Sequence, residues 1–191
     1  MKYQMITESG QLANYCQQVS GKSYIAVDTE FVRTRTLYPQ LGLIQLYDGD
    51  QLALVDPLAV DDLSALVQLL TDEQVVKVLH SCSEDLETFW TAMKVVPTPL
   101  FDTQFAAGLL NMGPSLGYAK LVEQRLGISL DKGESRTDWL ARPLSEQQLE
   151  YAANDVFHLF ALYPQLANEI EALGRTQWVF DEMRQLAEKK R

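Results

Sequence analysis

Hydrophobic positions in the first half of the chain fall into short runs bounded by polar and turn-forming residues, a pattern typical of buried β-strands. The five predicted strands are Tyr24–Asp28, Leu41–Tyr47, Gln51–Asp56, Val75–Leu79 and a short strand around Phe101. The turn signal Asp48-Gly49-Asp50 lies between the second and third strands, so we expect these two to pair as an antiparallel hairpin.

Helical spacing of apolar residues follows the strands and dominates the second half of the chain. The predicted helices are Asp61–Leu70, Ser83–Met93, a helix after Phe101 through Leu110, Ser115–Leu126, a helix from Ser145 to about Phe160, and Ile170–Lys189. Ser83 is a candidate N-cap, Ser145 and Gln148 form a capping box, and Pro164 is expected to limit or kink its helix. The order of elements predicts one α/β layered domain with a mixed sheet.

The chain of 191 residues has 26 acidic and 16 basic side chains and a formal net charge of −10. This balance disfavours a passive nucleic-acid-binding protein, but not an enzyme that contacts a few phosphates and binds cations at its centre. No apolar run approaches the roughly 18–20 residues that span a bilayer, and Met1–Gln11 does not resemble a secretory signal, so we expect a cytoplasmic protein. Cys16 and Cys82 lack metal-site spacing and are expected to be free thiols.

Acidic residues with a defined spacing provide the candidate chemistry. Asp28 and Glu30 are two residues apart on a predicted strand, so their side chains point to the same face. Asp85 follows the fourth predicted strand, and Tyr151 and Asp155 share one face of a predicted helix. Taken alone, each motif is better explained by solvated acids at the end of a strand, in the first turn of a helix or on an exposed helical face.

In combination, these acids match the requirements of phosphodiester hydrolysis, in which two divalent ions neutralise charge on the attacking and leaving oxygens. Mg²⁺ and Mn²⁺ prefer carboxylate and water ligands, which must converge from separate elements. Tyr151 is suited to orient the attacking water, because a phenol with a reference pKa of about 10 is a poor base at neutral pH. Gln45 and His80 lie near strand ends and are candidates to hydrogen-bond such a site, with a structural role favoured for His80.

The motifs Asp28-x-Glu30, Asp85 and Tyr151-x-x-x-Asp155 occur in the order of the tyrosine-containing branch of the DEDD 3′–5′ exonuclease superfamily, which the chain resembles. Within it, the chain resembles the bacterial ribonuclease D family through three longer stretches: DTEFVRTRTLYPQLGLIQL, HSCSEDLE and LDKGESRTDWLARPLSEQQLEYAANDV. The resemblance extends from Tyr3 to about Leu186.

The resemblance implies a ribonuclease H-like fold with a mixed five-stranded sheet flanked by helices. It also implies hydrolysis of RNA from its 3′ hydroxyl end, with release of nucleoside 5′-monophosphates, in the maturation of tRNA and other small structured RNA. Asp28 would bridge two divalent metal ions, Mg²⁺ or Mn²⁺, with Glu30 and Asp155 on one ion and Asp85 on the other, and Tyr151 would orient water. Residues 1–191 would form a single exonuclease domain, without the HRDC-type C-terminal domains of the family.

Four further residues are candidates to bind substrate. Phe31 is placed to stack on a terminal base or to serve as a core aromatic residue. Arg33, Arg35 and Arg136 are candidate phosphate ligands, with solvated loop charges as the alternative, and Trp139 is expected to anchor a loop or the core. Two other functions stay open: a 3′–5′ exonuclease acting on DNA, because the acidic motifs do not select the sugar, and a non-catalytic RNA-binding module.

Overall fold

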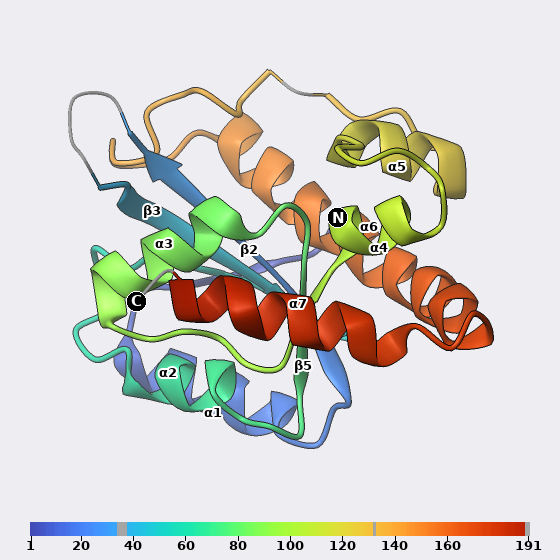
Figure 1. The fold of residues 1–191 in the computed structure, drawn as a ribbon. Coiled ribbons are helices and arrows are strands. Elements are labelled where there is room, and N and C mark those ends of the chain that lie inside the picture. The colour runs from blue at the N-terminus through green and yellow to red at the C-terminus, as the bar shows by residue number, and fades with distance from the viewer. Residues whose placement is uncertain (34–37, 132, 190–191) are drawn as a thin grey trace.

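The computed structural model describes residues 1–33, 38–131 and 133–189, which form an α/β domain around one mixed six-stranded sheet (Figure 1). The strands are β1 (Gln4–Ile6), β2 (Tyr24–Val32), β3 (Gln40–Tyr47), β4 (Leu52–Val55), β5 (Val76–Leu79) and β6 (Leu100–Asp102). Their order across the sheet is β1-β4-β3-β2-β5-β6. The helices are α1 (Ser9–Val19), α2 (Ser64–Leu70), α3 (Ser83–Met93), α4 (Thr103–Leu109), α5 (Tyr118–Leu126), α6 (Glu146–Ala172) and α7 (Thr176–Lys189).

The predicted α/β class with a mixed sheet is confirmed, but the expected count of five strands is wrong. The additional strand is β1, which pairs in parallel with β4 at the edge of the sheet. It has only three residues, Gln4, Met5 and Ile6, and this length is too short to show an alternation of apolar and polar positions.

Pairing of β2 with its two neighbours determines where the acidic motifs meet. The expected β3–β4 hairpin is antiparallel, and the Asp48 carboxylate accepts backbone N–H groups of Asp50 and Gln51 in its turn. On the other side of β2, strand β5 runs parallel to it, with Tyr24 opposite Val76. The start of α3, which follows β5, therefore lies at the same end of the sheet as Asp28.

The longest helix, α6, packs across the strands β2 to β5 and carries the third motif to the sheet. Its predicted capping box is confirmed, because Ser145 Oγ accepts from Gln148 N at 3.1 Å and Gln148 Oε1 accepts from Ser145 N at 2.9 Å. The helix continues past Pro164 to Ala172, so the expected limit at Pro164 is wrong. A buried stripe on both sides of the proline holds the helix together despite the missing N–H; its members are Leu159, Leu162, Leu166 and Ile170.

Two other helices can be compared with their predicted ends. The last helix begins at Thr176 rather than Ile170, because the chain turns at Gly174, which has a positive φ of 69°. Helix α3 has its predicted bounds, but its N-cap is Cys82 rather than Ser83. None of the described helices is long and apolar enough to cross a membrane.

A register shift interrupts the β2–β3 ladder beside the acidic motif. Glu30 pairs with Leu43, whereas the next residue, Phe31, pairs with Leu41, so that Gly42 is left unpaired. A Cβ atom at Gly42 would lie 2.7 Å from Trp139 Cβ and closer still to the Trp139 carbonyl oxygen. Trp139 is completely buried, as expected for an anchor residue, and it packs directly on this bulge.

Candidate active site

Three of the four predicted carboxylates converge where α6 crosses β2. Asp28, Glu30 and Asp155 each have an oxygen within 4.8 Å of the others, although Asp155 is more than a hundred residues away in sequence. Strand alternation directs Asp28 and Glu30 to one face, and α6 brings Asp155 to that face. An all-oxygen donor set of this kind fits a hard divalent cation such as Mg²⁺ or Mn²⁺.

The fourth carboxylate, Asp85, lies in the first turn of α3, outside this group of three. It is buried, and its Oδ1 accepts a hydrogen bond from Thr29 Oγ1. Burial raises the pKa of Asp85 well above its usual value, and the neighbouring charge of Asp28 adds to the effect. Asp85 therefore belongs electrostatically to the same site, and Thr29, which sequence reasoning missed, connects it to the Asp28-x-Glu30 motif.

The clustered acids are destabilised as anions. Burial raises the pKa of Asp28 from 3.8 to about 6. Burial also raises the pKa of Glu30 and of Asp155 well above their usual values, and the charges of the neighbouring carboxylates, Asp28 first among them, raise both further. A divalent cation between these oxygens would reverse this penalty, because it favours the ionised forms.

Tyr151 lies one helical turn before Asp155 on α6. Together with Asp28, these two residues line a cavity with a volume of about 230 Å³. Burial, followed by the charges of Asp155, Glu30 and Asp28, raises the pKa of the phenol, which a hydrogen bond with Ser135 only partly offsets. The phenol therefore stays protonated at neutral pH and can donate a hydrogen bond, in agreement with an orienting role rather than that of a base.

Gln45 and His80, the two polar candidates near the carboxylates, have defined hydrogen-bond partners. Gln45 is buried and its Nε2 donates to Glu30 Oε1 at 3.0 Å. His80 lies between Thr103 Oγ1 at 2.8 Å and the carbonyl oxygen of Leu116 at 2.9 Å, which agrees with the structural role favoured from sequence.

Tyr118 was not singled out in the sequence, yet its hydroxyl donates to the carbonyl oxygen of Asp155 and its ring lines the cavity. Its position on α5 gave no local signal, because the contact joins residues 37 positions apart.

The candidate substrate residues have different surroundings. Arg33 forms ion pairs with Glu87 at 2.7 Å and Glu84 at 3.7 Å, so α3 already holds its guanidinium group. Phe31 is half-buried beside the β-bulge, and Arg136 is exposed in the segment between α5 and α6. Arg35 lies outside the described residues. Contact of any of the four with RNA stays a prediction.

Comparison with known proteins agrees with this geometry. A model of the 3′–5′ exonuclease family matches residues 3–171, a span that includes β2, α3 and the part of α6 that carries Asp155. The chain belongs to the 3′–5′ exonuclease family. Ribonuclease D of Shewanella sp. (strain ANA-3) is 53% identical over 186 residues, covering 97% of this chain and 48% of that protein. The chain spans about half the length of the curated relatives it matches.

Solved structures of family members have the same fold. The crystal structure of Escherichia coli RNase D, described as an exoribonuclease involved in structured RNA processing, matches with a TM-score of 0.96 at 50% identity, over 100% of this chain and 51% of that one. Brucella melitensis NrnC with bound Mg²⁺ matches with a TM-score of 0.83 at 26% identity, over 100% of this chain and 92% of that one. Divalent metal binding is therefore found in a protein that shares the fold of this chain.

Proposed function

We propose that this exonuclease hydrolyses RNA one nucleotide at a time from a free 3′ hydroxyl end and releases nucleoside 5′-monophosphates. The observation that carries the proposal is the convergence of Asp28, Glu30 and Asp155, with Asp85 electrostatically coupled to Asp28, beside a cavity that Asp28, Tyr151 and Asp155 line. Hydrolysis of a phosphodiester bond with divalent metal ions needs several oxygen ligands in one place. A purely structural role does not account for such a cluster, because neighbouring carboxylates without a cation repel one another and destabilise the fold.

The proposed cofactor is a pair of divalent ions, Mg²⁺ or Mn²⁺. Asp28 has the central place for a bridging ligand, because its charge acts on Glu30, on Asp155 and on Asp85 alike. Glu30 and Asp155 would share one ion with it, and Asp85 would hold the other. When bound, the ions would neutralise charge on the reacting oxygens and lower the pKa of water.

The protein's own contribution is orientation and proton placement. Tyr151 keeps its proton, so its hydroxyl can donate to an oxygen at the reacting centre and fix the direction of the attacking water. Gln45 donates to one oxygen of Glu30 and so fixes the orientation of this carboxylate, which would be a metal ligand.

RNA is favoured over DNA as the substrate, because the relatives most similar in sequence are named ribonuclease D and the matching Escherichia coli protein is described as an exoribonuclease. The Escherichia coli protein is described as acting in structured RNA processing. Together with the resemblance to the ribonuclease D family, this leads us to propose tRNA precursors or other small structured RNA in the cytoplasm as the natural substrates.

A time course on matched RNA and DNA oligonucleotides, each labelled at the 5′ or the 3′ end, tests the proposal. With Mg²⁺ or Mn²⁺ we expect a descending ladder from 5′-labelled RNA and labelled mononucleotide from 3′-labelled RNA. Chelator, a 3′-phosphate, Asp28→Asn or Asp155→Asn should each stop the reaction while the variants stay folded. Faster degradation of DNA than of RNA would show that the chain is a deoxyribonuclease rather than a ribonuclease. RNA binding without any hydrolysis would support a non-catalytic binding module.

A further inference from the structure

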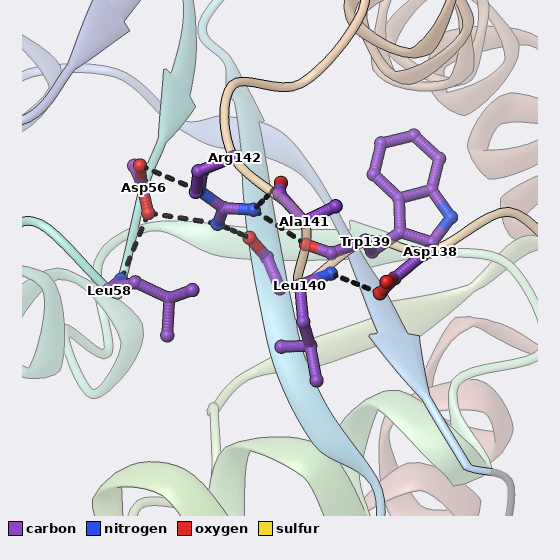
Figure 2. Close-up of polar contacts among 8 residues, drawn as sticks. Asp56, Leu58, Asp138, Trp139, Leu140, Ala141 and Arg142 are labelled. Carbon is purple, nitrogen blue, oxygen red and sulfur yellow. Dashed lines mark hydrogen bonds and ion pairs between the residues drawn. The ribbon is translucent and has the colours of Figure 1, made fainter.

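Arg142 forms a dense hydrogen-bonded cluster in the segment that joins α5 to α6. Figure 2 shows its guanidinium group between the carboxylate of Asp56, just after β4, and the carbonyl groups of Trp139 and Ala141. Nε and Nη2 donate to the two oxygens of Asp56 at 3.0 and 2.9 Å. Nη1 donates to the carbonyl oxygens of Trp139 and Ala141, both at 2.8 Å, and Nη2 also donates to that of Gly42 at 2.7 Å.

These contacts occupy all five N–H donors of the guanidinium group, so Arg142 has no donor left for a substrate phosphate. The Asp56 side chain is only 10% exposed, and its Oδ1 also accepts the backbone N–H of Leu58 at 3.0 Å. A bidentate pair in such surroundings is rigid and specific in direction. In this structure Arg142 therefore holds parts of the protein together, with every donor directed at the protein itself.

The cluster fixes Trp139 against the β-bulge. Arg142 holds the carbonyl groups of both Trp139 and Gly42, and these two residues are in direct contact, since a Cβ on Gly42 would lie 2.7 Å from Trp139 Cβ. The bulge that Gly42 creates lies opposite Glu30 and Phe31. The ion pair thus connects the sheet next to a candidate metal ligand with the segment between α5 and α6.

Trp139 in turn contacts the candidate orienting residue. Its ring lies 6.1 Å from that of Tyr151, centroid to centroid, with 38° between the planes. The same segment supplies Ser135, which hydrogen-bonds with Tyr151. Gln148 of α6 secures the segment between these points by donating to Thr137 Oγ1 at 3.0 Å and to the carbonyl oxygen of Asp138 at 3.2 Å.

We propose that the Arg142–Asp56 ion pair positions Tyr151 for catalysis, acting through Trp139 and the segment that carries Ser135. The proposal rests on the proposed function, because it assumes that Tyr151 acts at the reacting centre. It makes Arg142 and Asp56 positioning residues: they lie outside the cavity of the carboxylates, and their loss should lower kcat and leave the KM for RNA nearly unchanged.

A double-mutant cycle separates positioning from plain stabilisation of the fold. Lysine at position 142 keeps the charge but has three donors in place of five and cannot form the bidentate pair. Arg142→Lys should lower kcat about 10-fold, in the range found for residues that orient a catalytic group. In a Tyr151→Phe background, where there is no hydroxyl left to position, the same substitution should change kcat by less than about 2-fold.

The matched control is Arg125→Lys. Arg125 also forms a bidentate ion pair between distant segments, with Glu169 of α6, and it does not line the cavity of the carboxylates. Arg125→Lys should change kcat by less than about 2-fold, both in the unmodified chain and in the Tyr151→Phe background. Thermal unfolding of every variant must show a folded protein at the assay temperature. If Arg142→Lys does not fold, Asp56→Asn is used in the same cycle, because the amide cannot accept both N–H groups of Arg142.

The outcomes of the cycle are distinct. A 10-fold loss that disappears in the Tyr151→Phe background supports the proposal. An equal loss in both backgrounds, or no loss in the first, overturns it and leaves the proposed function intact. If Tyr151→Phe alone leaves kcat unchanged, Tyr151 does not act in catalysis, and the proposal that Arg142 and Asp56 position it is overturned as well. If the unmodified chain is inactive, the proposed function itself has failed.

Discussion

Replacing Asp28 by asparagine should stabilise the metal-free protein while it removes hydrolytic activity. The amide is nearly the same size as the carboxylate, and its oxygen can still accept the backbone N–H of Thr29, which lies 2.9 Å from Asp28 Oδ1. What the substitution removes is a partly buried negative charge beside Glu30 and Asp155. The site therefore trades stability for the ability to bind cations.

The size and sign of this effect follow from the pKa of Asp28. Burial raises it from 3.8 to about 6, so at neutral pH the ionised carboxylate costs about 3 kcal/mol of folding free energy, at 1.36 kcal/mol per pKa unit. The folded-state pKa lies above the unfolded value, so the penalty is absent below pH 3.8, grows as the pH rises and is complete once the pH exceeds 6. A gain of this size would raise the Tm of a chain of this length by about 6–12 °C.

Urea unfolding followed by circular dichroism in EDTA, at pH 4 and pH 7.5, measures the difference between the unmodified chain and Asp28→Asn. We expect a gain of about 3 kcal/mol at pH 7.5 and almost none at pH 4. Mg²⁺ should stabilise the unmodified chain more than the variant, because the variant lacks a ligand.

The matched control is Asp102→Asn. The two oxygens of the buried Asp102 carboxylate accept backbone N–H groups of Ser81, Cys82 and Gln104. The amide of asparagine has one oxygen and cannot keep all three hydrogen bonds, so the substitution should cost about 1–3 kcal/mol. If Asp28→Asn is destabilised at pH 7.5 as the control is, the argument that the carboxylate cluster is under electrostatic strain is refuted.

Three further predictions concern the surroundings of the site. Gly42→Ala should cost about 1–3 kcal/mol in urea unfolding and lower kcat, because its Cβ would overlap Trp139; unchanged stability would contradict the packing at the bulge. Gln45→Leu should raise the Mg²⁺ concentration for half-maximal activity about 10-fold, because Glu30 loses its donor, and an unchanged Mg²⁺ titration would exclude this role. Arg136→Gln should raise KM and reduce the salt dependence of RNA binding without changing kcat, provided that this exposed residue contacts a phosphate.

Features set by local periodicity could be predicted from the sequence. The shared face of Asp28 and Glu30 follows from strand alternation, and that of Tyr151 and Asp155 from the helical repeat. The capping box at Ser145 likewise needs only four neighbouring residues. These local rules, with the family resemblance, were sufficient to select the residues that converge in the fold.

Features set by tertiary packing could not be predicted in this way. The three-residue strand β1 exists because β4 offers a free edge, and α6 continues through Pro164 because the sheet buries the residues around it. Arg33 resembled a phosphate ligand in a polar loop, yet its ion pair with Glu87 joins residues 54 positions apart. No periodic pattern encodes a contact at such a separation.

Tertiary contacts of the arginines near the acidic motifs affect how the chain can bind its substrate. Of the arginines that flank the acidic motifs, Arg33 is held by α3 and Arg142 by Asp56, in contacts that stabilise the protein around the site. With 26 acidic against 16 basic side chains and a net charge of −10, the overall charge of the chain does not attract RNA. We therefore expect affinity for the 3′ end to depend steeply on divalent ions and only weakly on monovalent salt, because few phosphate–arginine contacts release few counterions. A steep salt dependence of RNA binding at saturating Mg²⁺ would contradict this expectation and would mean that several basic side chains contact phosphates, among them the candidates Arg33, Arg35 and Arg136.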